Sequence, residues 1–151
     1  MPTHYPGTPA EKQALDVYIK LERAADAVTA RINSHLSNFN LTVSQFGVLE
    51  ALYHLGAMHQ NELAEKILKS SGNMTLVIDN LSKRNLVKRQ RDTEDRRRVQ
   101  VHLTEEGQAL IAQIFPRHVQ IVVDVMGTLT SDEQLQLDAL CRKVGLGADE
   151  K

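Results

Sequence analysis

Residues 59–107 read HQNELAEKILKSSGNMTLVIDNLSKRNLVKRQRDTEDRRRVQVHLTEEG, and this stretch decides the fold. Apolar residues recur at helical spacing over 61–68 and again over 74–81, with a short polar break at 69–72 between them. The apolar face of the second segment comprises Met74, Val77, Ile78 and Leu81. Two short amphipathic helices joined by so short a turn form a helix-turn-helix, whose second helix can enter a DNA major groove.

A β-hairpin is predicted directly after the second helix. Asn85 closes that helix, because asparagine tolerates the left-handed conformation that a C-terminal cap requires. Two strands follow at 86–91 and 98–103, and in the second of them apolar and polar residues alternate. The segment between them, 92–97, is too long for a two-residue turn. We therefore expect an extended hairpin with an arginine-bearing tip, which is a wing.

The wing carries a resemblance to a known family. The pattern D-x-x-D-R-R at 92–97, followed by L-T-x-x-G at 103–107, resembles that of the MarR family (multiple antibiotic resistance regulators), and residues 75–87 resemble its recognition helix. Asn85 stands where that family usually has glycine, and Leu76 where it often has a basic residue. Leucine can contact a thymine methyl group but cannot pair with guanine, so base preferences of relatives do not transfer to this chain.

Composition narrows the class of protein. The chain has 151 residues, of which 42% are hydrophobic and 4% aromatic, and this fits one domain with an aliphatic core of packed helices. The single cysteine excludes an intramolecular disulfide, and the sequence shows neither an unbroken apolar span nor a signal peptide. We expect a cytoplasmic protein without a membrane partner. The net charge is −1, but basic residues crowd 83–98, so one positive face is expected.

Three apolar-rich helices are predicted outside the DNA-reading module, at 10–36, 106–126 and 131–145. The capping box Thr42-x-x-Gln45 predicts a further helix that ends at Gly56, and Thr130-x-x-Glu133 caps the last of the three. Pro116 predicts a kink in the second of them, because proline removes a helical hydrogen bond. Cys141, in the third, is expected to be a small buried packing residue, with a redox sensor as the alternative. The first helix is so long that it needs a packing partner over much of its length.

A second copy of the chain is the simplest partner, and the family resemblance implies the same dimer. The predicted fold class is mainly α with a small β-hairpin wing, in which a winged helix-turn-helix is flanked by long dimerisation helices. We expect a single MarR-like domain over 1–151. Within it, 10–38 and 105–145 form the dimerisation helices, and 42–104 form the DNA-binding lobe.

The candidate DNA contacts lie on the second helix of the helix-turn-helix and on the wing. They are Ser70, Ser71, Asn73, Thr75, Leu76, Asn80, Lys83, Lys88, Arg89, Asp95, Arg96 and Arg97. Flexible cations such as Lys83, Lys88 and Arg89 suit phosphates rather than bases. Arg97 suits a narrow minor groove, with Asp95 holding its guanidinium. The alternatives are capping and solvated residues on the helix, and a loose loop tip.

A ligand site is implied by the resemblance alone, because MarR relatives bind small aromatic or phenolic compounds between the dimer helices and the DNA-binding lobe. The candidates are Tyr18, Glu22, Phe46, Tyr53, Phe115 and His118, although plain core residues would look the same. No catalytic cluster, metal-ligand spacing or cofactor motif appears. We expect a homodimeric repressor of a pseudo-palindromic operator, released by such a ligand or by oxidation. The alternative is a winged-helix module that binds proteins.

Overall fold

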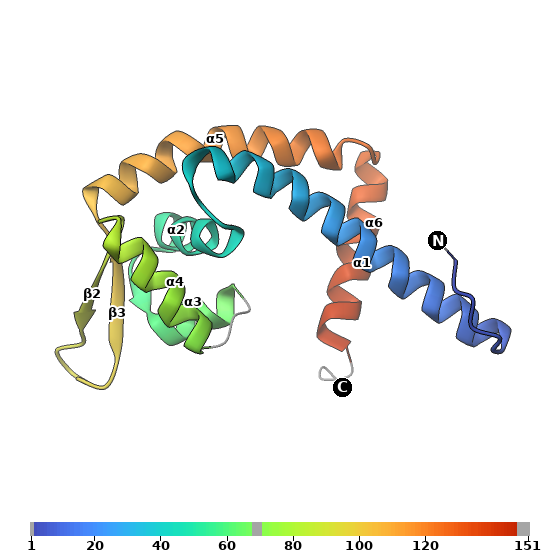
Figure 1. The fold of residues 1–151 in the computed structure, drawn as a ribbon, viewed down its shortest axis with the longest axis horizontal. Helices are drawn as coiled ribbons and strands as arrows, with labels where there is room; N and C mark the ends of the chain where they lie inside the picture. Colours follow the sequence, from blue (N-terminus) through green and yellow to red (C-terminus); the bar gives the residue numbers. More distant parts are fainter. Residues whose placement is uncertain (1, 68–70, 148–151) are drawn as a thin grey trace.

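The computed structural model describes residues 2–67 and 71–147 and shows a helical molecule with a small antiparallel sheet. Its elements are α1 (Pro9–Leu36), the 3-10 turn η1 (Ser37–Phe39), α2 (Val43–Leu55), β1 (Met58–His59), α3 (Gln60–Lys66), α4 (Ser71–Lys83), β2 (Val87–Arg91), β3 (Val99–Leu103), α5 (Glu105–Met126) and α6 (Ser131–Leu146). A lobe built from α2 to β3 lies beneath α1 and α5, which extend away from it towards α6 (Figure 1). The predicted fold class is confirmed.

The core sits in this lobe, where α2, α3 and α4 pack on one side of the sheet. The predicted apolar stripe of α4 is confirmed, because Met74, Ile78 and Leu81 are fully buried. They meet Leu49 of α2 and Leu63 of α3, which are equally inaccessible. These side chains fix the angle at which α4 leaves the lobe, so the core determines which face of that helix stays outside.

A third strand was missed by the sequence analysis. β1 has two residues and pairs antiparallel with β3, which gives the strand order β1-β3-β2. Met58 lies opposite Val101, and on the other side Arg89 of β2 also lies opposite Val101. Two residues are too few to show a two-residue alternation in the sequence. The strand nevertheless matters, because it places His59 at the start of α3 and beside the wing.

Pro116 lies inside α5 without ending it, and the helix arches over the lobe (Figure 1). Ile111 and Ile114, one turn before the proline, are fully buried in the lobe. Although α5 holds no unbroken apolar run of membrane-spanning length, its length and average composition would allow it to cross a membrane, and among residues 2–67 and 71–147 it is the one helix to which this applies. The same composition serves a helix that packs on more than one side.

Much apolar surface stays uncovered on the helices outside the lobe. The large exposed apolar side chains there are Val17, Tyr18 and Leu21 of α1, Val119 and Val123 of α5, and Leu135, Leu137, Leu140 and Val144 of α6. None of the described residues of α6 is buried. The expectation of a buried Cys141 is therefore wrong for the single chain, since the thiol is exposed in a groove between α1 and α6. These helices cannot bury their apolar faces within one copy.

Candidate nucleic-acid interface

The outward face of α4 combines polar side chains with one large apolar group. Asn73 and Thr75 are exposed, Leu76 is 61% exposed, and Asn80 is half-buried. Ser71 opens the helix, whereas Ser70, also a predicted contact, lies outside the described residues. An exposed leucine has no packing role in the lobe, so it is available to an apolar partner such as a thymine methyl group.

Arg89 of β2 holds α4 in place. Its guanidinium pairs with the Asp79 carboxylate and donates a hydrogen bond to the Thr75 carbonyl oxygen at 3.1 Å. Its Nε also donates to Gln60 Oε1 at 3.4 Å, and Gln60 Nε2 donates to Thr75 Oγ1 at 2.9 Å. One network thus joins β2, α3 and α4. The sequence alone predicts Arg89 as a phosphate neighbour and gives no sign of this network, because its members are far apart along the chain.

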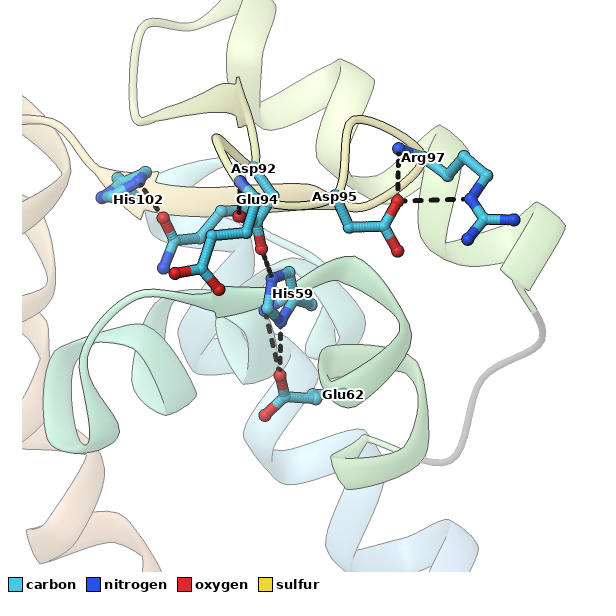
Figure 2. A network of polar contacts seen from close by, with 8 residues as sticks. His59, Glu62, Asp92, Glu94, Asp95, Arg97 and His102 are labelled. Atoms are coloured by element: carbon cyan, nitrogen blue, oxygen red, sulfur yellow. Dashed lines mark hydrogen bonds and ion pairs between the residues drawn. The ribbon is translucent and has the colours of Figure 1, made fainter.

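The wing tip is organised around Asp95. Its Oδ1 accepts hydrogen bonds from the Arg97 backbone N–H at 3.1 Å and from Arg97 Nε at 3.2 Å (Figure 2). The Arg96 carbonyl oxygen accepts from the Arg91 guanidinium at 2.7 Å. The Arg97 side chain is 92% exposed, so the carboxylate directs the guanidinium into solvent. An exposed ion pair adds little stability, and its effect here is to orient the arginine.

The root of the wing is tied to α3 through His59. Its Nδ1 lies 2.9 Å from Glu62 Oε1, and its Nε2 lies 2.8 Å from Asp92 Oδ2 (Figure 2). Asp92 Oδ1 in turn accepts the Glu94 backbone N–H at 2.9 Å. The hydrogen bonds to Asp92 and Glu62 raise the pKa of His59 above its ordinary value. The pKa of Asp92 is lowered, first by the Glu94 N–H and then by His59.

Not every basic residue of the 83–98 stretch faces outward for a partner. Arg84 donates to the carbonyl oxygens of Asn40 at 2.6 Å and Phe39 at 3.1 Å, and so holds the turn before α2 against the end of α4. Arg89 is bound to Asp79, Thr75 and Gln60 within the lobe. The other basic residues of the stretch are all exposed: Lys83, Lys88, Arg91, Arg96, Arg97 and Arg98. The positive face is therefore smaller than the sequence count implies.

The structure brings four of the six candidate ligand residues together between α2 and α5. The ring centroids of Phe46 and His118 are 4.5 Å apart, and those of Phe115 and His118 are 5.8 Å apart. Tyr53 joins through Phe115 at 6.4 Å. Tyr18 and Glu22 do not join this aromatic cluster. They interact with each other on α1, where the hydrogen bond to Glu22 raises the pKa of Tyr18.

Two further histidines enlarge the aromatic cluster, and the sequence analysis missed both. His54 lies 4.6 Å from Phe115, and His35 of α1 lies 6.3 Å from His118. Within the described part of the chain, His35 Nε2 and His118 Nδ1 are buried without a hydrogen-bond partner. Burial lowers the pKa of both imidazoles, so both are neutral near pH 7. Their scattered positions in the sequence gave no signal of this convergence.

A helix-turn-helix with an exposed second helix, set beside an arginine-tipped hairpin, is the architecture of winged-helix DNA-binding proteins. Comparison with known proteins specifies the family. The MarR family model matches residues 41–99. The transcriptional regulator MhqR of Bacillus subtilis is 32% identical over 139 residues, covering 92% of this chain and 96% of MhqR. The chain belongs to the MarR family and is a DNA-binding transcription regulator, not an enzyme.

Two further relatives are informative. The transcriptional repressor NicR of Pseudomonas putida is 33% identical over 130 residues, covering 86% of this chain and 82% of NicR. A structure of BpsR from Bordetella bronchiseptica, a protein whose DNA binding is regulated by 6-hydroxynicotinic acid, superposes with a TM-score of 0.78. The two sequences are 31% identical, and the match covers 85% of this chain and 98% of BpsR.

Proposed function

We propose that this chain is a homodimeric, cytoplasmic repressor that binds a pseudo-palindromic operator and is released by a small aromatic ligand. The observation that carries the DNA-binding part is the exposed Arg97 guanidinium, which Asp95 orients at the tip of the hairpin that follows α4. A two-fold dimer would set two such lobes on half-sites about one helical turn apart, roughly 34–36 Å. Occupying that site would exclude RNA polymerase.

Each element of the lobe has its own proposed contact. The α4 face up to Asn80 enters the major groove, where Leu76 meets a thymine methyl group, and Ser70, just before the helix in the sequence, is a further proposed contact. Lys83 and Lys88 contact phosphates, which position the protein without reading sequence. Arg97 enters the adjacent minor groove, whose negative potential attracts a weakly hydrated guanidinium. Arg96 and Asp95 support it from the wing.

Dimerisation is proposed for the helices outside the lobe, 10–38 and 105–145. Its support is the apolar surface that α1, α5 and α6 leave uncovered in one copy, including Val17, Val123 and Leu140. Burying such side chains between two copies would stabilise the dimer by about 1.5–3 kcal/mol for each one fully covered. The lobe, 42–104, would then project from a shared helical body.

Release by a ligand is proposed for the aromatic cluster. Phe115 and His118 lie on α5, which joins the lobe to the helical body, so a ligand held there could favour a lobe spacing that does not fit DNA. Only the difference in ligand affinity between the two spacings weakens DNA binding. The regulation of BpsR by an aromatic acid and the naming of NicR as a repressor support this reading. Oxidation of Cys141 is the second proposed route.

The effector proposal is tested by replacing His118 with phenylalanine, which keeps a ring but removes its polar atoms. We expect His118→Phe to bind DNA as well as the unmodified protein and to lose release by aromatic acids such as 6-hydroxynicotinic acid. Competition of these acids against bound DNA measures both properties. Unchanged release in the variant would place the effector elsewhere.

A salt titration tests the DNA-binding proposal. Binding to fragments selected from genomic DNA should weaken log-linearly with salt, because phosphate contacts release counterions. Arg97→Ala should weaken binding by about 1–3 kcal/mol without unfolding the protein. The control variant Arg142→Ala, on α6, should leave DNA affinity unchanged. A protein-interaction module, the alternative, would show no preference among duplexes. Unchanged operator affinity in Arg97→Ala would refute the wing contact.

A further inference from the structure

The imidazole of His59 is held between two carboxylates from different parts of the lobe. Glu62 belongs to α3, and Asp92 follows the last residue of β2, at the root of the wing. The His59 and Asp92 side chains are only 20% and 23% exposed, so water screens this pair less than a surface pair. In Figure 2 the ring bridges the helix below it and the wing above it.

The geometry determines the protonation state of the ring. A neutral imidazole has one N–H donor and one lone pair, whereas an ionised carboxylate can only accept. Here both ring nitrogens lie within 2.9 Å of a carboxylate oxygen. Both contacts can be hydrogen bonds only when both nitrogens carry a proton, that is, when His59 is the imidazolium cation. The raised pKa of His59 has the same cause.

Charged groups face His59 from each element around it. β1 packs against β3 and α3. From α3 comes Glu62, and from the wing come Asp92 and Arg98. The Arg98 cation opposes protonation of the ring, but it acts at longer range than the two carboxylates in direct contact. The two carboxylates therefore outweigh Arg98 and favour the protonated form of His59.

We propose that His59, as a cation, is the positioning residue that fixes the wing on the helix-turn-helix, so that DNA affinity depends on its proton. This rests on the proposed role of the wing in DNA binding. Asp92 accepts the Glu94 N–H with its second oxygen and donates its own N–H to the Arg98 carbonyl oxygen at 3.0 Å. The residue that meets His59 thus also shapes the loop carrying Arg97. If Asp92 loses its contact with His59, this loop becomes more mobile, and ordering it on DNA then costs conformational entropy and weakens binding.

The direction of the pH effect follows from the raised pKa. Below the ordinary histidine value of 6.5 the imidazolium holds both carboxylates. As the pH rises through the higher pKa of the folded state, the ring loses a proton and one of the two hydrogen bonds. DNA affinity should therefore fall as the pH rises through this pKa and level off once the ring is neutral. Asp92 and Glu62, whose pKa values are lowered, stay ionised throughout.

The test compares two histidine variants on selected DNA fragments between about pH 6 and pH 9, a range that starts near the ordinary histidine pKa and extends above it. His59→Gln keeps a polar side chain but cannot carry the charge. His102→Gln changes a histidine of β3 whose ring contacts the Gln100 side-chain amide oxygen. We expect the unmodified protein and His102→Gln to lose affinity as the pH rises, and His59→Gln to bind weakly with no such trend. The same pH trend in all three would overturn the inference.

A measurement without DNA separates this inference from the proposed function. The His59 ring should titrate by NMR above pH 6.5, and Asp92→Asn should lower that midpoint. The Glu94 amide should exchange with solvent faster above the midpoint, as the wing root loosens. A ring that titrates at or below the ordinary value refutes the inference even if DNA binds. A protein that meets both expectations but binds no DNA refutes the proposed function instead.

Discussion

Arg89 and Asp79 show how a single ion pair can set the geometry of the DNA-facing helix. The pair joins β2 to α4, and the same guanidinium reaches the Thr75 carbonyl oxygen and Gln60. The Arg89 side chain is 30% exposed, so the ion pair adds little to the free energy of folding, and its main effect is to orient α4. A cation committed to three partners within the lobe is poorly placed to neutralise a phosphate at the same time.

We predict that Arg89→Gln lowers operator affinity without changing its salt dependence. Losing the network would let α4 shift, which weakens binding, but no phosphate contact is removed. Removing a phosphate contact would instead reduce the slope of log affinity against log salt by about 0.9. Lys88→Gln, which changes the neighbouring exposed cation, should reduce that slope. If Arg89→Gln reduces the slope as Lys88→Gln does, Arg89 is a phosphate contact after all.

Residues that act locally could be predicted from the sequence, and residues that act across the fold could not. Asn85 has a φ of 59°, as its left-handed propensity predicted. The capping boxes at Thr42 and Thr130 are present because each needs only residues three apart. His59 and Arg84, by contrast, find partners 33 and 44 residues away. No local pattern marks such pairs.

At the scale of the elements, the wing and α5 approach each other closely through their backbones. Gly107, in the first turn of α5, lies against the backbone of Leu86, just before β2. A Cβ at this position would lie 2.0 Å from the Leu86 carbonyl oxygen, which already accepts the Thr104 N–H at 3.1 Å. This contact gives a physical reason for the glycine that ends the L-T-x-x-G pattern.

We predict that Gly107→Ala destabilises the fold by about 1–3 kcal/mol, the usual range for overpacking. Gln108→Ala, at the next and exposed position of the same turn, should change stability little. Denaturant unfolding of both variants measures the difference. Equal midpoints for the two would mean that the wing and α5 can separate at no cost.

Periodicity predicted most helices, because their apolar residues recur on one face of the helix, and alternation predicted the second strand of the wing. It missed β1, which is too short to show a pattern, and it also missed the capping box of Thr8 with Glu11, which begins α1 at Pro9, one residue before the predicted start. Of the ligand candidates, the rings from Phe46 to His118 converge, whereas Tyr18 and Glu22 do not. The residue types at these positions do not reveal which faces of the helices pack against each other.

On the scale of the whole molecule, the main feature is the apolar surface that α1 and α6 leave uncovered in one copy. The groove between α1 and α6 is lined mainly by apolar atoms of Val17, Leu21, Leu137, Leu140 and Val144. A folded monomer rarely leaves such a surface in water. A second copy would cover it and, in doing so, would set the distance between the two winged lobes.

We predict that Leu140→Glu shifts the protein to single chains, because it places a charge on the surface that two copies would bury. Leu140 is 60% exposed in one copy, so the variant should still fold. Arg142→Gln changes the net charge by the same amount on the other side of α6 and should leave association intact. Sedimentation velocity distinguishes the two. A Leu140→Glu variant that still sediments as a pair would place the contact elsewhere.

The number of chains bound to each DNA duplex shows whether the protein acts as a pair. Sedimentation equilibrium of the purified protein with a duplex selected from genomic fragments gives the number of chains bound to each duplex. A homodimeric regulator should place two chains on one pseudo-palindromic duplex and should bind more weakly when either half-site is scrambled. One chain per duplex, with affinity indifferent to the second half-site, would contradict this expectation.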